Sequence, residues 1–169
     1  MLTLIVEDGT GVQNANTYLT VAEAETILDN LGYSFDAALS EDQKEQFLIR
    51  SASYLESFWN QYQGNKNSCD QGLQWPRYGA CIYNCAVAND VVPDQIKQAQ
   101  ALGTYYESNS QSLQPITSGQ TVKMKEIAGA VKKEYFDNGS VDGVTQFRDI
   151  QNLLKPTFKF GGAIRVIRV

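Results

Sequence analysis

The stretch that decides the fold reads SEDQKEQFLIRSASYLESFWNQYQ and covers residues 40–63. Ser40 stands three residues before Gln43, the spacing of a capping box, in which each side chain binds the other residue's backbone N–H. Acidic side chains follow at once, and they are favoured at the positive end of a helix dipole. The pattern predicts a helix from about Glu41 to Gln63. The face that we expect to lie in the core consists of Leu48, Ala52, Leu55 and Trp59.

Three further helices follow from similar signals. Thr20 and Glu23 form a second capping box, and the helix that it opens should end at Leu31, before a glycine. A helix over 92–108 has a proline in its first turn. A shorter helix over 146–154 is stopped by a proline two residues later.

The expected β-structure is smaller in extent. Residues 2–6 form an apolar run that favours a short strand. Apolar and aromatic residues alternate with lysines on both sides of an Ala-Gly-Ala turn, which predicts a hairpin over 121–136. The tail over 163–169 has strong strand propensity. The sequence therefore predicts an α+β, mainly helical fold: a small helical bundle with a β-hairpin and an extended C-terminal strand or arm.

The same elements define the expected domain organisation. A helical domain over 1–156 carries an inserted loop over 64–90 and the hairpin over 121–136, and a C-terminal arm covers 157–169. The chain has 169 residues, 43% of them hydrophobic, which is enough for one packed core. We expect no membrane contact, because no apolar run approaches the roughly 18 residues that span a bilayer and the start lacks a basic signal region.

The charge is acidic and unevenly spread. The chain has 14 basic and 19 acidic residues, a net charge of −5. Residues 1–119 hold 5 basic and 14 acidic side chains, whereas residues 120–169 hold 9 and 5. The overall balance argues against a protein that coats nucleic acid. The separation of an acidic part of the chain from a basic part favours head-to-tail contact between copies. It is equally compatible with two solvated faces of a monomer.

The composition also limits the chemistry. The absence of histidine excludes Ser–His–Asp and Cys–His catalysis as well as histidine-bound zinc. Cys69, Cys81 and Cys85 lack a fourth metal ligand. Free thiols are therefore favoured, and a disulfide between two of the cysteines is the alternative. Gly9-Thr10-Gly11 lacks the lysine of a phosphate loop. We therefore expect neither an enzyme nor a bound metal or cofactor.

The run QGLQWPR over 71–77 is the most distinctive short stretch. Pro76 disfavours the helical conformation for Trp75, and the large indole should anchor the surrounding loop on the helices. We expect Arg77 to point outward as a contact residue for a partner.

Several stretches taken together resemble a family of tailed-bacteriophage proteins. They are LIVEDGTGV (4–12), NANTY (14–18), AEA (22–24), LIRSASYL (48–55), QGLQWPR (71–77), VVP (91–93) and EY (134–135). The family is that of head–tail adaptors, or connectors, which are also labelled DnaT-like single-stranded-DNA-binding proteins. The stretch over 80–88 and the tail beyond residue 156 depart from the family pattern.

The resemblance implies a structural virion protein of the phage neck, made in the bacterial host cytoplasm. Such adaptors form a ring, usually of twelve copies, that links capsid to tail while the genomic DNA passes through it. The implied partners are the portal protein, neighbouring adaptor subunits and a downstream neck or tail protein. The alternative that the family label suggests is a single-stranded-DNA-binding protein.

Each alternative has its own candidate residues. For contact with the portal or a neighbouring subunit they are Arg77 and a tail that could add as an edge strand, namely Ile164, Arg165, Val166, Ile167, Arg168 and Val169. For DNA they are the hairpin lysines Lys123, Lys125, Lys132 and Lys133, with Tyr135 and Phe136 as stacking groups.

Overall fold

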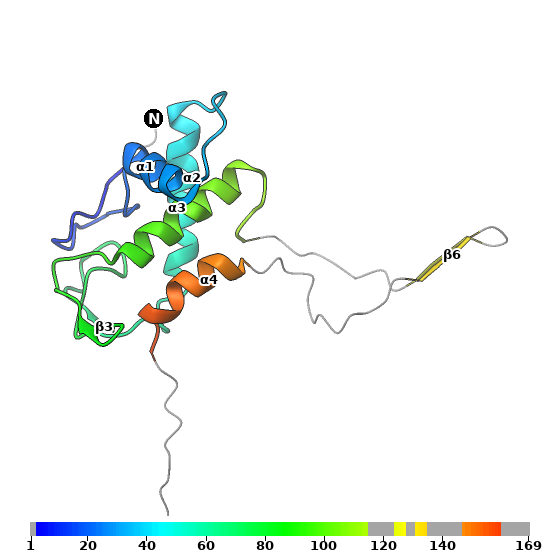
Figure 1. Cartoon of the computed structure of the whole chain (residues 1–169). Helices are drawn as coiled ribbons and strands as arrows, with labels where there is room; N and C mark the ends of the chain where they lie inside the picture. Colours follow the sequence, from blue (N-terminus) through cyan, green and yellow to red (C-terminus); the bar gives the residue numbers. More distant parts are fainter. Residues whose placement is uncertain (1–2, 115–123, 128–130, 135–146, 160–169) are drawn as a thin grey trace, which may run out of the picture. The chain divides into compact units, whose positions relative to one another are not determined.

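The computed structural model describes residues 3–114, 124–127, 131–134 and 147–159 (Figure 1). It divides the chain into two units, a helical body over 1–113 and 147–169 and a hairpin unit over 114–146. The described part of the body holds the helices α1 (Val21–Leu31), α2 (Glu41–Glu56), α3 (Asp94–Ser108) and α4 (Arg148–Leu154). The expected α+β, mainly helical fold is confirmed. Among the described residues, no helix has both the length and the apolar content that crossing a bilayer requires.

Helix α3 is the centre of the body, because it packs against each of α1, α2 and α4 (Figure 1). Its buried face includes Ile96 and the amide side chain of Gln100, neither of which is exposed. The Gln100 amide donates to Thr17 Oγ1 at 2.7 Å and to the Leu48 carbonyl at 3.0 Å. Its oxygen accepts the Tyr18 N–H at 3.0 Å. One buried glutamine thus joins α3 to α2 and to the segment before α1.

The predicted starts of the first two helices are confirmed, whereas α3 and α4 each begin two residues after the predicted positions 92 and 146. The hydroxyl of Thr20 caps α1 and that of Ser40 caps α2, and both capping boxes are complete. Helix α1 ends at Gly32, whose φ of 79° is the left-handed conformation that glycine adopts without strain.

Helix α2 ends at Glu56 rather than at Gln63, so the predicted end is wrong. The next N–H groups bind carbonyls three residues back, and the chain turns. Tyr62 then folds back and donates its hydroxyl to the Leu55 carbonyl at 2.9 Å. Tyr62 is buried, whereas Trp59, which was expected in the core, is 62% exposed.

The end of the described body is held against this turn. A 3₁₀ turn, η1 (Lys155–Thr157), follows α4 directly. Phe158 forms an antiparallel bridge with Tyr62, and the Lys159 N–H donates to the Gln61 carbonyl at 2.7 Å. Residues 157–159, which were expected to belong to the C-terminal arm, therefore pack on the helical body.

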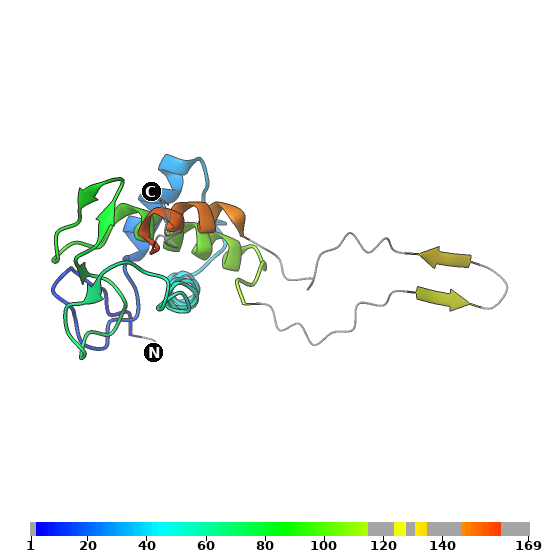
Figure 2. The same ribbon diagram turned by 90° about the horizontal axis from the view of Figure 1, so that it is seen from below.

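The remaining pairings are short. The expected N-terminal strand is reduced, within its described residues, to one parallel bridge between Val6 and Thr17. The 64–90 loop is fixed by two antiparallel pairs, β1 (Asn65–Lys66) with β2 (Arg77–Tyr78) and β3 (Cys81–Ile82) with β4 (Cys85–Ala86). In the other unit, β5 (Met124–Ile127) pairs with β6 (Val131–Glu134), which confirms the hairpin (Figure 2).

Candidate functional site

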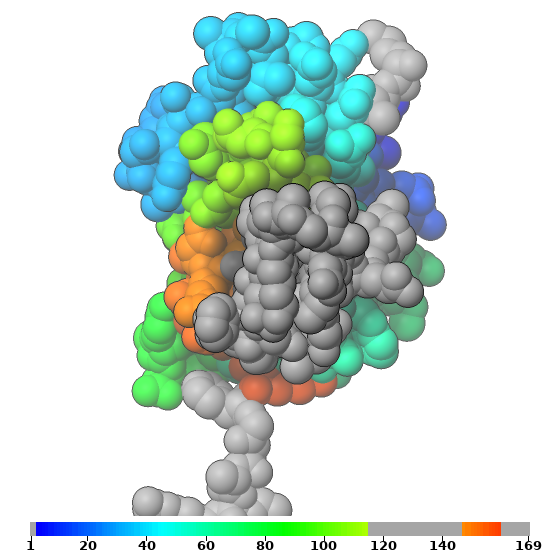
Figure 3. Space-filling view, turned by 90° about the vertical axis from the view of Figure 1, so that its right-hand side faces the viewer, coloured from blue at the N-terminus to red at the C-terminus, as the bar shows by residue number. Residues whose placement is uncertain are grey.

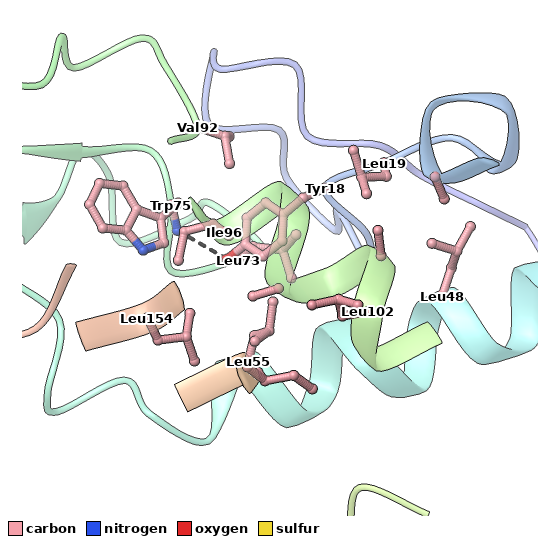
Figure 4. Packing of buried hydrophobic residues seen from close by; sticks show 14 of the residues in the cluster. Tyr18, Leu19, Leu48, Leu55, Leu73, Trp75, Val92, Ile96, Leu102 and Leu154 are labelled. Carbon is pink, nitrogen blue, oxygen red and sulfur yellow. Dashed lines mark hydrogen bonds between the residues drawn. The ribbon is translucent and has the colours of Figure 1, made fainter. Parts of the chain in front are cut away.

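Two of the motif stretches meet in the structure although about sixty residues separate them. The Gly72 N–H donates to the Val12 carbonyl at 3.0 Å, and the Trp75 N–H donates to the Tyr18 hydroxyl at 3.2 Å (Figure 4). A Cβ at Gly72 would lie 2.6 Å from the backbone of Ala15, so only glycine permits this approach. The 4–18 and 71–77 stretches therefore form one structural junction.

A buried carboxylate organises the turn after Val6. Glu7 is 3% exposed, and its oxygens accept the N–H groups of Gly9 and Gly11 at 2.9 Å and of Val12 at 2.8 Å. Those N–H groups are the ones that a phosphate loop would offer to its ligand. Because an internal carboxylate already binds them, the Gly-Thr-Gly turn serves the fold.

The predicted anchoring role of Trp75 is confirmed. Its side chain is fully buried, and its ring meets that of Tyr62 edge-on, with centroids 5.9 Å apart (Figure 4 shows the tryptophan inside the cluster). The Tyr18 hydroxyl, which accepts the Trp75 N–H, donates to Glu56 at 2.6 Å. Burial raises the pKa of the Glu56 carboxyl above its usual value, and the hydrogen bond from Tyr18 opposes this effect.

The predicted outward orientation of Arg77 is wrong. The residue is 5% exposed, and its guanidinium donates to the carbonyls of Gln63 at 2.7 Å, Gly64 at 2.8 Å and Gln74 at 3.3 Å. A planar fork of five N–H groups suits several carbonyls at once. Arg77 thus joins both ends of the 63–77 loop, a role that an isolated arginine after a proline does not reveal in the sequence.

The structure brings together part of the predicted DNA-binding set. Lys125 lies on β5 directly opposite Lys133 on β6, and Glu126 lies opposite Lys132. Residues opposite each other in an antiparallel ladder share a face of the hairpin, so Lys125 and Lys133 are neighbours on one face. Lys123, Tyr135, Phe136 and the tail residues 164–169 lie outside the described residues.

The described part of the helical body, 3–113 and 147–159, is strongly acidic. It holds 8 basic and 15 acidic residues, a net charge of −7. Lys44 pairs with Glu25 at 2.7 Å, and Arg50 lies 3.8 Å from Glu107.

The three cysteines are free and exposed. In the part of the chain that the structure describes, no group of three His, Cys, Asp or Glu side chains is placed to hold a metal.

These features define a small, mainly helical acidic protein with a separate two-stranded hairpin unit, in which the most distinctive motifs build the fold. The chain belongs to the family described as "Putative DnaT-like ssDNA binding protein", whose model matches residues 2–169. No curated protein and no solved structure matches it. The family membership agrees with the DnaT-like label of the resemblance, and the head–tail adaptor role stays a prediction.

Proposed function

We propose that this protein is a structural assembly protein, a head–tail adaptor that forms a ring under the portal of a tailed phage and links capsid to tail. It acts by shape and contact, not by catalysis. Its partners are the portal, neighbouring subunits, a downstream neck or tail protein and the DNA that passes through the ring. Its place is the neck of the virion.

The observation that carries this proposal is the charge of the helical body. The described body has a net charge of −7, and at least four of its eight cations have internal partners: Lys44 and Arg50 are in ion pairs, and Lys66 and Arg77 donate to carbonyls of the loop. Such a surface repels phosphates. It suits a ring wall along which DNA passes without binding, and it does not suit a protein that coats DNA.

A second candidate function, single-stranded-DNA binding, is favoured by the family description and by the hairpin. Lys125 and Lys133 are directly opposed, and like charges in that position destabilise a ladder. A phosphate between them would relieve the repulsion. In this candidate function the hairpin unit binds the DNA, and the acidic helical body does not contact it.

Two experiments distinguish the candidates. The adaptor role predicts that the full chain binds the purified portal of the same phage, and that deletion of residues 161–169 abolishes this binding while the circular-dichroism melt is unchanged. Retained binding after the deletion would contradict the role of the tail as the contact.

The DNA-binding role predicts that labelled oligo-dT binds at about 50 mM salt, that affinity falls steeply as salt rises, and that K125E/K133E removes binding. Lys97→Glu on α3 is the matched control and should leave it intact. No binding of the wild-type chain at that salt concentration would end this candidate.

A further inference from the structure

The turn after α2 carries an exposed tryptophan, and the segment that packs against this turn carries two exposed lysines. Trp59 is 62% exposed. Lys159 is hydrogen-bonded to the turn that carries Trp59. Its N–H donates to the Gln61 carbonyl at 2.7 Å, and its Nζ donates to the Asn60 carbonyl at 3.3 Å. Lys155 is exposed one turn earlier in the same segment. We call Trp59, Lys155 and Lys159 the Trp59 patch.

The patch holds unused positive charge. Lys155 binds the neutral Asn152 side chain at 2.7 Å, and neither lysine takes part in the ion pairs of the described chain. The neighbouring stretches 57–63 and 150–159 contain no acidic residue. Trp59 is thus exposed beside a segment that carries two lysines, neither of which forms an ion pair in the described chain. Trp is among the residues that most often carry the energy of a protein interface.

A hollow of complementary chemistry lies elsewhere on the body. It has a volume of about 210 Å³ and is lined by Glu25, Asp29, Phe35, Asp36 and Lys44, among others. Lys44 is engaged with Glu25 at 2.7 Å and lies over the Phe35 ring, while Asp29 and Asp36 are exposed. The four charged groups leave a net charge of −2. We call this the acidic hollow.

The two surfaces lie at opposite ends of α2. Lys44 stands in the first turn of the helix, which begins at Glu41, and Trp59 follows its last residue, Glu56. Sixteen helical residues at 1.5 Å each span about 24 Å. In Figure 3 the blue segment before α2 lies at the top and η1, in red, at the bottom. The patch of one molecule therefore cannot reach its own hollow.

We infer that the Trp59 patch docks in the acidic hollow of a second copy of this chain. Lys155 and Lys159 of one copy would neutralise the net charge of −2 in the acidic hollow of the other. The Trp59 indole would pack on the side of the hollow that Phe35 forms. The contact joins two different surfaces, so repetition leads to a ring or an open filament rather than to a two-fold dimer. The inference rests on the proposed function, since it supplies the subunit contact of the adaptor ring.

The test is sedimentation of the full chain from about 10 µM to about 1 mM, with salt as a variable. The average mass should rise with concentration and fall with salt. Trp59→Ala should weaken association about tenfold or more. K155E/K159E and D29K/D36K should each abolish it. The matched control is Tyr83→Ala, another aromatic residue, 72% exposed in the β3–β4 turn, which should change nothing.

Charge exchange makes the test specific. An equimolar mixture of K155E/K159E and D29K/D36K should associate again, because each reversed surface then finds its complement. Melting curves confirm that every variant is folded. A wild-type chain that stays monomeric at about 1 mM, an unchanged Trp59→Ala, or a mixture that stays monomeric would overturn the inference.

Two further results separate this inference from its alternatives. Oligo-dT that shifts the Trp59 fluorescence while W59A leaves self-association unchanged would assign the patch to nucleic acid and overturn the inference. If W59A still forms a ring on the portal, the inference fails and the adaptor role stands. If the wild-type chain does not bind the portal at all, the adaptor role fails.

Discussion

The Tyr18 hydroxyl donates a 2.6 Å hydrogen bond to the Glu56 carboxylate and so ties the segment before α1 to the C-terminal end of α2. The same hydroxyl accepts the N–H of Trp75. Tyr18→Phe would leave the half-buried carboxylate and a buried N–H without this partner. We expect a loss of about 2 kcal/mol in the free energy of unfolding, measured by urea titration.

Tyr83→Phe is the control for that variant. Tyr83 is 72% exposed, so the loss of its hydroxyl should change stability by less than about 0.5 kcal/mol. Equal effects of the two substitutions would show that the Tyr18–Glu56 bond does not stabilise the junction.

Glu56 should make stability depend on pH. Burial raises the pKa of its carboxyl above 4.5, so the folded state holds this proton more tightly than the unfolded chain does. Its contribution to stability is therefore present below the unfolded pKa and declines as pH rises through the folded pKa. Glu56→Gln keeps an acceptor for Tyr18 but does not titrate.

Urea midpoints of the two proteins between about pH 4 and pH 8 provide the measurement. The stability of Glu56→Gln relative to the wild type should increase with pH over that range. A constant difference between the two proteins would contradict a raised pKa at Glu56.

Among the acidic residues of the N-terminal turn, Glu7 is expected to contribute most to stability. Its carboxylate accepts three N–H groups, and Glu7→Ala would leave them unsatisfied, with a loss of about 3 kcal/mol or more. Asp8 is exposed and binds only Thr10. Asp8→Ala should therefore lose less than about 1 kcal/mol. Thermal melts compare the two, and similar losses would argue against a central role for Glu7.

Arg77 should matter for stability rather than for partner contact. A lysine cannot donate to three carbonyls with the same planar geometry, so Arg77→Lys should destabilise the protein by about 2 kcal/mol. Arg148→Lys changes an exposed arginine and serves as the control. If Arg77→Lys melts like the wild type but binds the portal less well, the outward orientation inferred from the sequence would be restored.

The sequence predicted the helices well wherever the signal was local. Capping boxes at Thr20 and Ser40 set helix starts through contacts within four residues, and the structure contains both. The end of α2 depended instead on Tyr62 returning to the Leu55 carbonyl. Helical periodicity continues past such a turn, which is why Trp59 was assigned to the core.

The site residues show the same division. Trp75 was recognised as an anchor because a large ring before a proline in a long loop has few alternatives. The prediction for the orientation of Arg77 was wrong because its partners include the backbone carbonyls of residues 63 and 64. Every residue has such a carbonyl, so the sequence does not indicate which of them will bind the arginine. Glu7 was not recognised for the same reason, since it binds only backbone N–H groups. The acidic hollow joins residues of α1, α2 and the loop between them, so it appears only in the fold.

The mass of the purified chain, measured at low micromolar concentration with and without the portal of the same phage, tests the central claim most directly. The adaptor role predicts a monomer alone and a ring of many copies on the portal. A chain that stays monomeric with the portal, and whose mass changes only on addition of oligo-dT, would contradict the adaptor role and favour single-stranded-DNA binding.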